Sequence, residues 1–184
     1  FTENWLRNYK PDFSGVVVID AETGNILVNT SHSIEEDFQE FNYLARFTSA
    51  SVFKVITAAA AINEKLLKPQ TQLPQVGKTT SLRTWQLQDN GKPKRWMRHY
   101  SLEDSLALSI NAIFGKIGMN LLGDEILQKY GEKAGFNKDI PFQQDIEKST
   151  IQLPASSIET AQLASGYGQF AKLSPLHGAL SVSY

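Results

Sequence analysis

Apolar residues in the first part of this chain follow the short period of a β-strand. Within residues 13–29, two runs rich in β-branched and aliphatic residues flank a cluster of turn residues at 21–25. The pattern predicts a β-hairpin whose loop takes its left-handed backbone from Gly24 and Asn25. The mixed, acidic stretch 31–47 then predicts a loop with a short helix.

The most continuously apolar segment lies at residues 48–63. Ser and Thr gather at its start, as is typical of a helix N-terminus. Beyond that start, polar side chains interrupt the apolar residues at Lys54 and Thr57. A helix that is apolar on every face is usually buried inside a domain. We therefore expect a buried helix here, ending before Pro69.

Helical spacing of apolar residues continues through the second half of the chain. Ser101, with an acid at the third position after it, opens a helix in the manner of a capping box. Ser174 and Pro175 open the last helix as N-cap and first helical residue, and we expect that helix to be still running at Tyr184. Two more helices are predicted between these, over residues 124–134 and 157–164.

The order of elements, one hairpin followed by many helices, predicts an α+β fold. A two-stranded hairpin is too small to be a complete sheet, so the sheet needs more strands than this chain supplies. The chain has 184 residues, of which 41% are hydrophobic, and this is enough for one domain with a sizeable core. We predict a single domain over residues 1–184.

Composition excludes several classes of function. The formal net charge of −1 gives no basic footprint for nucleic acid or an anionic membrane. The chain has no cysteine, so neither a disulfide framework nor a thiolate metal site can form. His32, His99 and His177 share no metal-ligand spacing, and we expect no metal or cofactor. No apolar run approaches the roughly 20 residues of a membrane span. The chain as given is expected to be soluble, with any anchor or export signal outside it.

Two polar residues at the front of the apolar helix could carry chemistry. Ser51 and Lys54 are three residues apart, which places both side chains on one helix face. An S-x-x-K pair taken alone is more often an ordinary surface serine and lysine. Here the flanking residues are apolar, and a lysine buried among them must pair with an anion or lower its pKa. A neutral amine beside a hydroxyl is a general base beside a nucleophile.

A second polar pair interrupts the next strongly apolar helical region. Ser109 and Asn111 are poor residues for a helix interior, because both side chains compete with the backbone for hydrogen bonds. Their presence predicts either a junction between helices or groups directed into a cleft. Taken alone, this pair is a weak indication of function.

Together the two pairs resemble the signature of penicillin-binding proteins and class A β-lactamases, which joins S-x-x-K with S-D-N and K-T-G. The flanking sequence also resembles that family's transpeptidase domains, from about residue 13 to the last residue. The segments that carry the resemblance are 15–27 (first hairpin), 47–63 (nucleophile helix), 101–114 (second motif), and 157–164, 166–169 and 173–177 (before the third motif). The resemblance implies the penicillin-binding transpeptidase fold, in which this hairpin belongs to a central antiparallel sheet.

The resemblance also implies roles for four residues. Ser51 would be acylated by a D-Ala-D-Ala stem peptide or by a β-lactam, and Lys54 would take the serine proton. Ser109 would relay a proton toward the leaving group, and Asn111 would bond the substrate amide and Lys54. The backbone N–H of Ser51, at the positive end of its helix, would supply one half of an oxyanion hole.

Two departures from the signature qualify the resemblance. The second motif is Ser-Ile-Asn at residues 109–111, which is normal for transpeptidases and argues against a class A β-lactamase. No K-[TS]-G triplet follows Asn111. The Gly-Lys-Thr-Thr stretch at 77–80 is not that motif, because it lacks the final glycine and precedes the second motif. It is not a phosphate-binding loop either, because position 72 is Gln where a glycine is needed. We therefore expect an incomplete transpeptidase domain, closer to class B enzymes, with the third-motif strand absent.

The function implied is a peptidoglycan D,D-transpeptidase that works through an acyl-serine. Its expected partners are stem peptides, β-lactams and possible cell-wall synthesis proteins. It would act on the periplasmic or extracellular face of the cytoplasmic membrane, held there by an anchor outside this chain. One alternative is a β-lactamase, which needs a water-activating base. A second is a non-catalytic penicillin-binding or sensing module that lacks the third motif.

Overall fold

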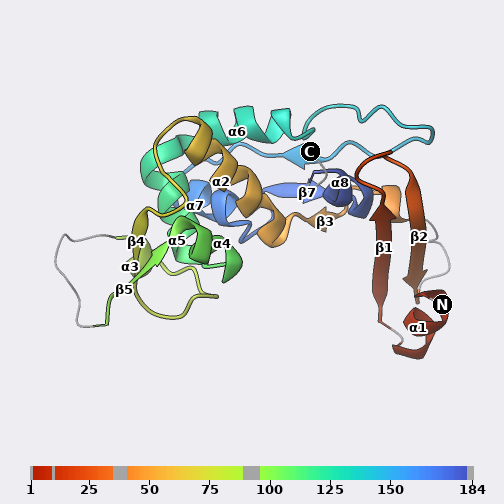
Figure 1. The fold of residues 1–184 in the computed structure, drawn as a ribbon, viewed down its shortest axis with the longest axis horizontal. Coiled ribbons are helices and arrows are strands. Elements are labelled where there is room, and N and C mark those ends of the chain that lie inside the picture. Colours follow the sequence, from red (N-terminus) through yellow and green to blue (C-terminus); the bar gives the residue numbers. More distant parts are fainter. Residues whose placement is uncertain (1, 10, 35–40, 89–95, 182–184) are drawn as a thin grey trace. The chain divides into compact units, whose positions relative to one another are not determined.

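A computed structural model describes residues 2–9, 11–34, 41–88 and 96–181 (Figure 1). The chain folds into two compact units, each assembled from separate stretches of sequence. Unit 1 comprises residues 1–47, 135–150 and 172–184, and unit 2 comprises 48–134 and 151–171. The prediction of a single domain over 1–184 stays a prediction.

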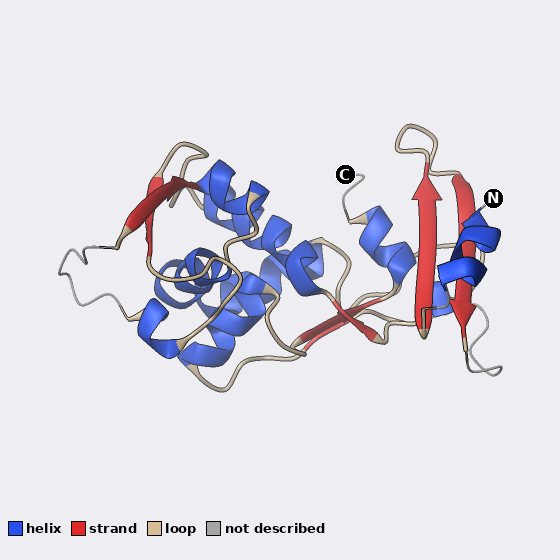
Figure 2. Ribbon diagram, turned by 90° about the horizontal axis from the view of Figure 1, so that it is seen from below, coloured by secondary structure: helices blue, strands red, loops and turns tan. Residues whose placement is uncertain are grey.

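Unit 1 contains the expected β-hairpin, and Figure 2 shows its two strands side by side. The strands pair antiparallel, with Val17 opposite Asn29, and the register shifts next to Ile19. Gly24 has the left-handed φ of +73°, as predicted, but Asn25 has no positive φ, so one left-handed residue is enough for this loop. The elements of this unit are α1 (Thr2–Tyr9), β1 (Phe13–Ile19), β2 (Ile26–Ser33), η1 (Phe41–Tyr43) and α8 (Pro175–Leu180).

The stretch predicted as a loop with a short helix is partly strand. β2 continues to Ser33, and the 3₁₀ turn η1 is the short helix within the described part of residues 31–47; residues 35–40 lie outside the described part. Two hydrogen bonds tie η1 to the hairpin: Asn42 Nδ2 donates to the carbonyl oxygen of Thr30 over 2.9 Å and to Asn29 Oδ1 over 2.7 Å. The hairpin therefore gains packing and polar contacts that an isolated pair of strands lacks.

Helix α8 begins as predicted and ends earlier than expected. Ser174 Oγ accepts a hydrogen bond from the backbone nitrogen of His177 over 3.1 Å, and Pro175 is the first helical residue. The helix ends at Leu180, with Ser181 in a turn, so the prediction of a helix running on through the chain's end was wrong for the part described. Residues 182–184 lie outside that part.

Unit 2 is a helical body whose helices α2, α5, α6 and α7 pack around one apolar core. Ser101 caps α4 as expected, its Oγ accepting from the backbone nitrogen of Asp104 over 2.9 Å. Fully buried core side chains include Phe53, Ile113, Phe114, Leu127 and Leu163. The elements within this unit are η2 (Ala50–Val52), α2 (Phe53–Asn63), β4 (Gln72–Gln75), α3 (Thr84–Leu87), β5 (Arg98–Ser101), α4 (Leu102–Ala107), α5 (Asn111–Ile117), the π-helical turn η3 (Gly118–Leu122), α6 (Gly123–Lys133) and α7 (Ser157–Ser165).

Short strands complete the secondary structure. β4 and β5 pair antiparallel within unit 2. Three further strands form a small sheet in the order β3-β7-β6, and they are β3 (Phe47–Thr48), β6 (Thr150–Ile151) and β7 (Ala171–Leu173). Among the helices described, none is both long and apolar enough to cross a bilayer.

The expectation of a wholly buried apolar helix at residues 48–63 was wrong in two respects, and the first is that α2 begins only at Phe53, after β3 and η2. The second is that one face of the helix is exposed. Most of α2 is buried, with Phe53 and Ala60 fully enclosed. One stripe is exposed: Val55 and Ile62 are each 40% accessible, and Ala59 between them is also exposed. These three positions lie on one helix face, because their spacings of four and three residues bring them together. The apolar sequence of α2 therefore does not indicate which face of the helix is covered by other elements.

Candidate active site

Ser51 and Lys54 lie at the front of α2, one helical turn apart. The chain leaves β3 and turns through η2 before α2 begins at Phe53, so the serine hydroxyl stands at the exposed entry of a helix whose body is buried. Ala50, just before the serine, has a φ of +45°, a backbone conformation that costs a non-glycine residue roughly 1–3 kcal/mol. The surrounding structure therefore holds this turn in a strained form next to the hydroxyl.

Ser109 and Asn111 lie at a junction between two helices, which is one of the two possibilities that the sequence left open. α4 ends at Ala107, and Ser109 takes a left-handed φ of +53° before α5 begins at Asn111. This break interrupts the hydrogen bonds between backbone groups of a continuous helix. Ser and Asn suit such a break, because their side chains readily bond nearby backbone groups. It also turns both side chains toward α2, where they reach Lys54.

The four residues form one hydrogen-bonded network around the lysine amine. Lys54 Nζ lies 2.8 Å from Ser51 Oγ, 3.0 Å from Ser109 Oγ and 2.7 Å from Asn111 Oδ1. Ser109 Oγ in turn donates to Ser51 Oγ over 2.8 Å. The structure thus brings together all four residues singled out in the sequence.

The environment of Lys54 favours a neutral amine more than a surface lysine does. Its side chain is 1% exposed, and burial lowers its pKa from 10.5 to about 8. Removing water disfavours the charged ammonium, and the three oxygens around Nζ are neutral groups that return only part of the lost solvation. A lysine with a pKa near neutrality can act both as a proton acceptor and as a proton donor.

The orientation of Asn111 is set by a loop that the sequence interpretation missed. The carbonyl oxygen of Thr79 accepts from the backbone nitrogen of Asn111 over 2.9 Å, and the carbonyl oxygen of Thr80 accepts from its Nδ2 over 2.8 Å. Since Nδ2 is held by a carbonyl, Oδ1 faces Lys54. The Gly-Lys-Thr-Thr stretch at 77–80 matches no side-chain motif. Its role uses backbone carbonyls, which no side-chain pattern reveals.

Gly166 supports the turn before Ser51 from a neighbouring helix. It ends α7 with a left-handed φ of +66°, and a Cβ built on it would lie 1.6 Å from the carbonyl oxygen of Ala50. No side chain fits in that space, so glycine is required both by the backbone angle and by the contact. In the sequence, a glycine just after a predicted helix indicates the end of that helix. It does not indicate a contact with the backbone of Ala50.

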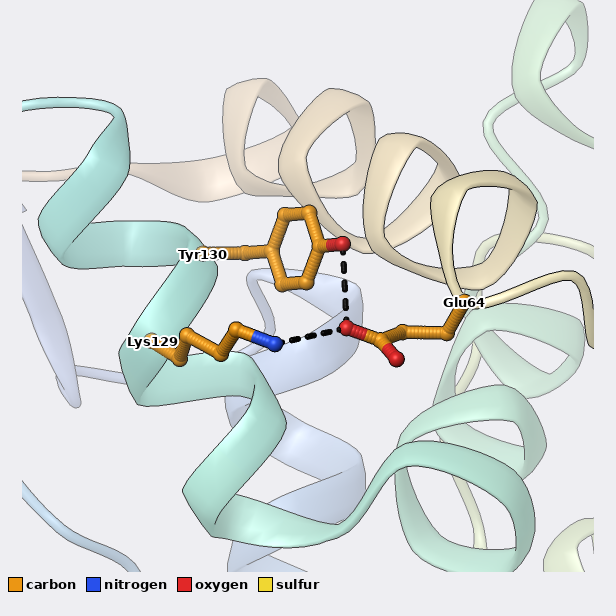
Figure 3. Close-up of polar contacts among 3 residues, drawn as sticks. All are labelled: Glu64, Lys129 and Tyr130. Atoms are coloured by element: carbon orange, nitrogen blue, oxygen red, sulfur yellow. Dashed lines mark hydrogen bonds and ion pairs between the residues drawn. The ribbon is translucent and has the colours of Figure 1, made fainter.

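The far end of α2 is tied to α6 by a surface cluster (Figure 3). Glu64 Oε1 accepts from Lys129 Nζ over 2.8 Å and from the Tyr130 hydroxyl over 3.1 Å. The lysine and tyrosine bonds lower the pKa of the Glu64 carboxyl, and the carboxylate raises the pKa of Lys129. The cluster thus joins the end of α2 to a neighbour at the opposite end from Ser51.

Solved structures resemble the fold of this chain over nearly its whole length. Penicillin-binding protein A from M. tuberculosis, described as an imipenem acyl-enzyme complex, matches with a TM-score of 0.71 at 21% identity, covering 95% of this chain and 46% of that one. A peptidoglycan glycosyltransferase from Burkholderia ambifaria matches with a TM-score of 0.74 at 17% identity, covering 98% of this chain and 55% of that one. The chain therefore spans about half the length of the solved relatives it matches. These likenesses establish the fold as the α+β transpeptidase fold, as expected from the sequence.

The match to a family model is more specific. The model of the penicillin binding protein transpeptidase domain matches residues 14–182, which include all four residues of the network. Among curated protein sequences, none matches this chain. With its α+β fold and a family match over almost its full length, the chain belongs to the penicillin-binding protein transpeptidase domain family.

Proposed function

We propose that this chain is the part of a serine D,D-transpeptidase that carries the nucleophile and the general base. The observation that supports it best is the position of Lys54 Nζ, 2.8 Å from Ser51 Oγ and within 3.0 Å of the oxygens of Ser109 and Asn111. A buried amine with a pKa of about 8 beside a hydroxyl meets the requirement for an activated serine nucleophile.

The acylation step follows from the hydrogen bonds around the amine. When Lys54 is neutral, its two N–H groups donate to Ser109 Oγ and Asn111 Oδ1, and its lone pair faces Ser51 Oγ. The amine takes the proton of the Ser51 hydroxyl as the oxygen attacks the carbonyl carbon between two D-alanines. The C–N bond of that amide then breaks, leaving an acyl-serine ester. Transfer of the acyl group to an acceptor amine restores the free hydroxyl.

Ser109 connects the nucleophile with the departing amine. Its hydroxyl lies between Lys54 Nζ at 3.0 Å and Ser51 Oγ at 2.8 Å, so a proton taken by the lysine can pass through it to the leaving nitrogen. Asn111 holds Lys54 by its Oδ1 and would bond the substrate amide as well. The reaction needs no redox change, because one amide is exchanged for another through an ester.

The substrate proposed is the D-Ala-D-Ala end of a peptidoglycan stem peptide, and β-lactams would acylate the same serine. Family membership supports this choice, and the M. tuberculosis relative is described as an acyl-enzyme with imipenem. Cell-wall chemistry places the proposed reaction on the outer side of the cytoplasmic membrane, with attachment through a segment outside this chain. Other cell-wall synthesis proteins are proposed partners on the same basis.

The test is covalent labelling of the full-length protein that contains this chain. A fluorescent penicillin should add one adduct, and mass spectrometry should place it on the peptide containing Ser51. Ser51→Ala should abolish the label, whereas Ser157→Ala, at an exposed serine of α7, should leave it unchanged. A label that survives Ser51→Ala would contradict the proposal.

The lifetime of the adduct separates the proposal from its two alternatives. An adduct that persists for minutes to hours supports a transpeptidase. Release within seconds would identify a β-lactamase, and absence of any label on the full-length protein would favour a non-catalytic module.

A further inference from the structure

We propose that Gln86 is a positioning residue for the Ser51–Lys54 centre and acts through the loop that holds Asn111. The inference rests on the proposed function for its kinetic consequences. The hydrogen bonds that Gln86 makes within the described part of the structure go to the loop and not to the four residues of the network, and nothing in the sequence motifs points to it.

Gln86 is buried in α3, with 2% of its surface exposed, and all of its amide groups are used. Its Nε2 donates to the carbonyl oxygens of Val76 over 2.8 Å and Lys78 over 3.2 Å. Its Oε1 accepts from Ser81 Oγ over 3.0 Å and from the backbone nitrogen of Arg83 over 2.9 Å. When the donor and the acceptor of a buried side-chain amide are both hydrogen-bonded, the amide holds the groups that it joins in a fixed geometry.

The four bonds of Gln86 join two limbs of one loop. The limb at 76–78 lies before Thr79 and Thr80, and the limb at 81–83 lies after them. These two threonines supply the carbonyls that hold Asn111 by its backbone nitrogen and its Nδ2. Gln86 therefore closes the loop at its base, together with the direct bonds from Ser81 to the Lys78 carbonyl, and the tip of the loop orients the amide that faces Lys54.

The loop is also packed tightly against α3. Gly77 has a left-handed φ of +83°, and a Cβ there would lie 2.6 Å from the Trp85 ring and 3.1 Å from Gln86 Nε2. A loop of this kind lacks the regular backbone hydrogen bonds of a helix or a sheet. Its carbonyl groups therefore depend on side chains for hydrogen-bond donors. Gln75 also bonds the carbonyls of Val76 and Lys78, and Ser81 bonds the Lys78 carbonyl by its Oγ over 3.1 Å and its backbone nitrogen over 3.4 Å. Gln86 adds bonds to both limbs from α3.

Gln75 offers a matched control, because it shares the burial and one half of the contacts. It is 2% exposed, and its Nε2 donates to the carbonyls of Val76 over 3.2 Å and Lys78 over 3.3 Å. Those contacts lie on the first limb. Removing Gln75 should loosen that limb and leave the two limbs joined through Gln86 and through the bonds from Ser81 to the Lys78 carbonyl.

The kinetic experiment compares Gln86→Met with Gln75→Met in the full-length protein, using the rate of Ser51 acylation by a penicillin. Misplacement by about 1 Å can cost about 10²-fold in rate, so we expect a loss of roughly 10- to 10²-fold in Gln86→Met and less than about 2-fold in Gln75→Met. The loss should also disappear in an Asn111→Ala background, because the effect passes through that residue. Equal losses in the two glutamine variants, or additive losses with Asn111→Ala, would overturn the assignment.

The pH profile gives a readout that a general loss of stability would not produce, and hydrogen exchange gives one that is local to the Asn111 amide. Asn111 Oδ1 accepts from the Lys54 ammonium and so favours its charged form; releasing it should shift the apparent pKa of acylation downward in Gln86→Met. Independently of any activity, the peptide containing the Asn111 amide should exchange faster in Gln86→Met than in Gln75→Met. If the wild-type protein is not acylated, the proposed function fails, and hydrogen exchange still decides the positioning role.

A second variant covers the case in which Gln86→Met does not fold. Gln86→Glu keeps the shape and the acceptor for Ser81 and Arg83 but places a second oxygen against the carbonyls of Val76 and Lys78. It should show the same faster exchange at Asn111. Wild-type exchange at Asn111 in this folded variant would overturn the assignment.

Discussion

The carbonyl oxygen of Ala50 and the α-carbon of Gly166 are in such close contact that a Cβ on the glycine would lie 1.6 Å from that oxygen. Ala50 is the residue before the proposed nucleophile, and its φ of +45° is unusual for a residue with a side chain. The end of α7 therefore supports the strained turn that presents Ser51. The proposed nucleophile depends on a glycine that lies more than one hundred residues later in the chain.

Gly166→Ala should reduce acylation of Ser51 strongly, by about 10²-fold, because the turn at Ala50 must move to admit the new methyl group. The matched control is Gly123→Ala. Gly123 also has a positive φ, +72°, but nothing lies within 4 Å of its added Cβ. Both variants should lose about 1–3 kcal/mol of stability through backbone strain. Acylation rates measured on the folded fraction should fall in Gly166→Ala and stay near wild type in Gly123→Ala. Equal rates in the two variants would contradict the supporting role of Gly166.

The rate of acylation should depend on pH through Lys54. Because burial lowers the pKa of this amine to about 8, the rate should rise as the pH increases from about 6 and level off above about 9. The neutral amine is the form that would accept the serine proton, so the rate should rise, and not fall, as the pH increases. Stopped-flow labelling with a penicillin across this range measures the profile. A rate that is independent of pH, or that falls on going from about pH 6 to 9, would contradict this assignment of the base.

The lowered pKa of Lys54 also predicts how the stability of the fold depends on pH. The pKa of Lys54 falls on folding from 10.5 to about 8, so the unfolded chain binds more protons between these values. Burial of the charge destabilises the folded state fully below about pH 8, and this cost is relieved as the pH rises toward 10.5. The free energy of unfolding of the wild type should therefore rise relative to Lys54→Met across that window. Parallel curves would show that the pKa is not shifted.

Local patterns in the sequence were sufficient for much of the fold. The hairpin, the Ser101 cap and the Ser174–Pro175 helix start each depend on residues within a few positions of one another, and each is present. The pairing of Ser51 with Lys54 is equally local, because one helical turn sets it. The proximity of Ser109 and Asn111 to that pair was predicted from the family resemblance alone. No local rule relates these residues to Lys54, which lies 55 and 57 positions away in the sequence.

The features that were missed share a physical cause. The contacts from Thr79 and Thr80 to Asn111 are made by backbone carbonyls, which every residue has, so residue type carries no signal. Exposure of Val55 and Ile62 depends on which neighbours cover α2, and an apolar composition on all faces does not distinguish them. Sequence patterns report side chains and their periodicity, whereas these features are long-range or belong to the main chain.

The Glu64 cluster should contribute to stability in a manner that depends on pH and salt. Because the pKa of Glu64 is lowered on folding, its contribution is present above the usual carboxyl pKa of 4.5 and is lost as the pH falls through the lower, folded value. Glu64→Gln should therefore lower the melting temperature at neutral pH, by less in high salt, and the difference should vanish in acid. Acylation of Ser51 should not change. A difference in melting temperature that persists in strong acid would contradict this account.

The most direct test of the central claim is the acylation rate of Lys54→Met in the full-length protein, measured beside Lys68→Met. Lys68 is an exposed lysine of the same unit and controls for loss of one positive charge. General-base catalysis is worth about 10²–10⁴-fold, so Lys54→Met should lose at least about 10²-fold while still unfolding cooperatively, and Lys68→Met should match the wild type. A folded Lys54→Met protein that is acylated at Ser51 as fast as the wild type would contradict the assignment of Lys54 as the base.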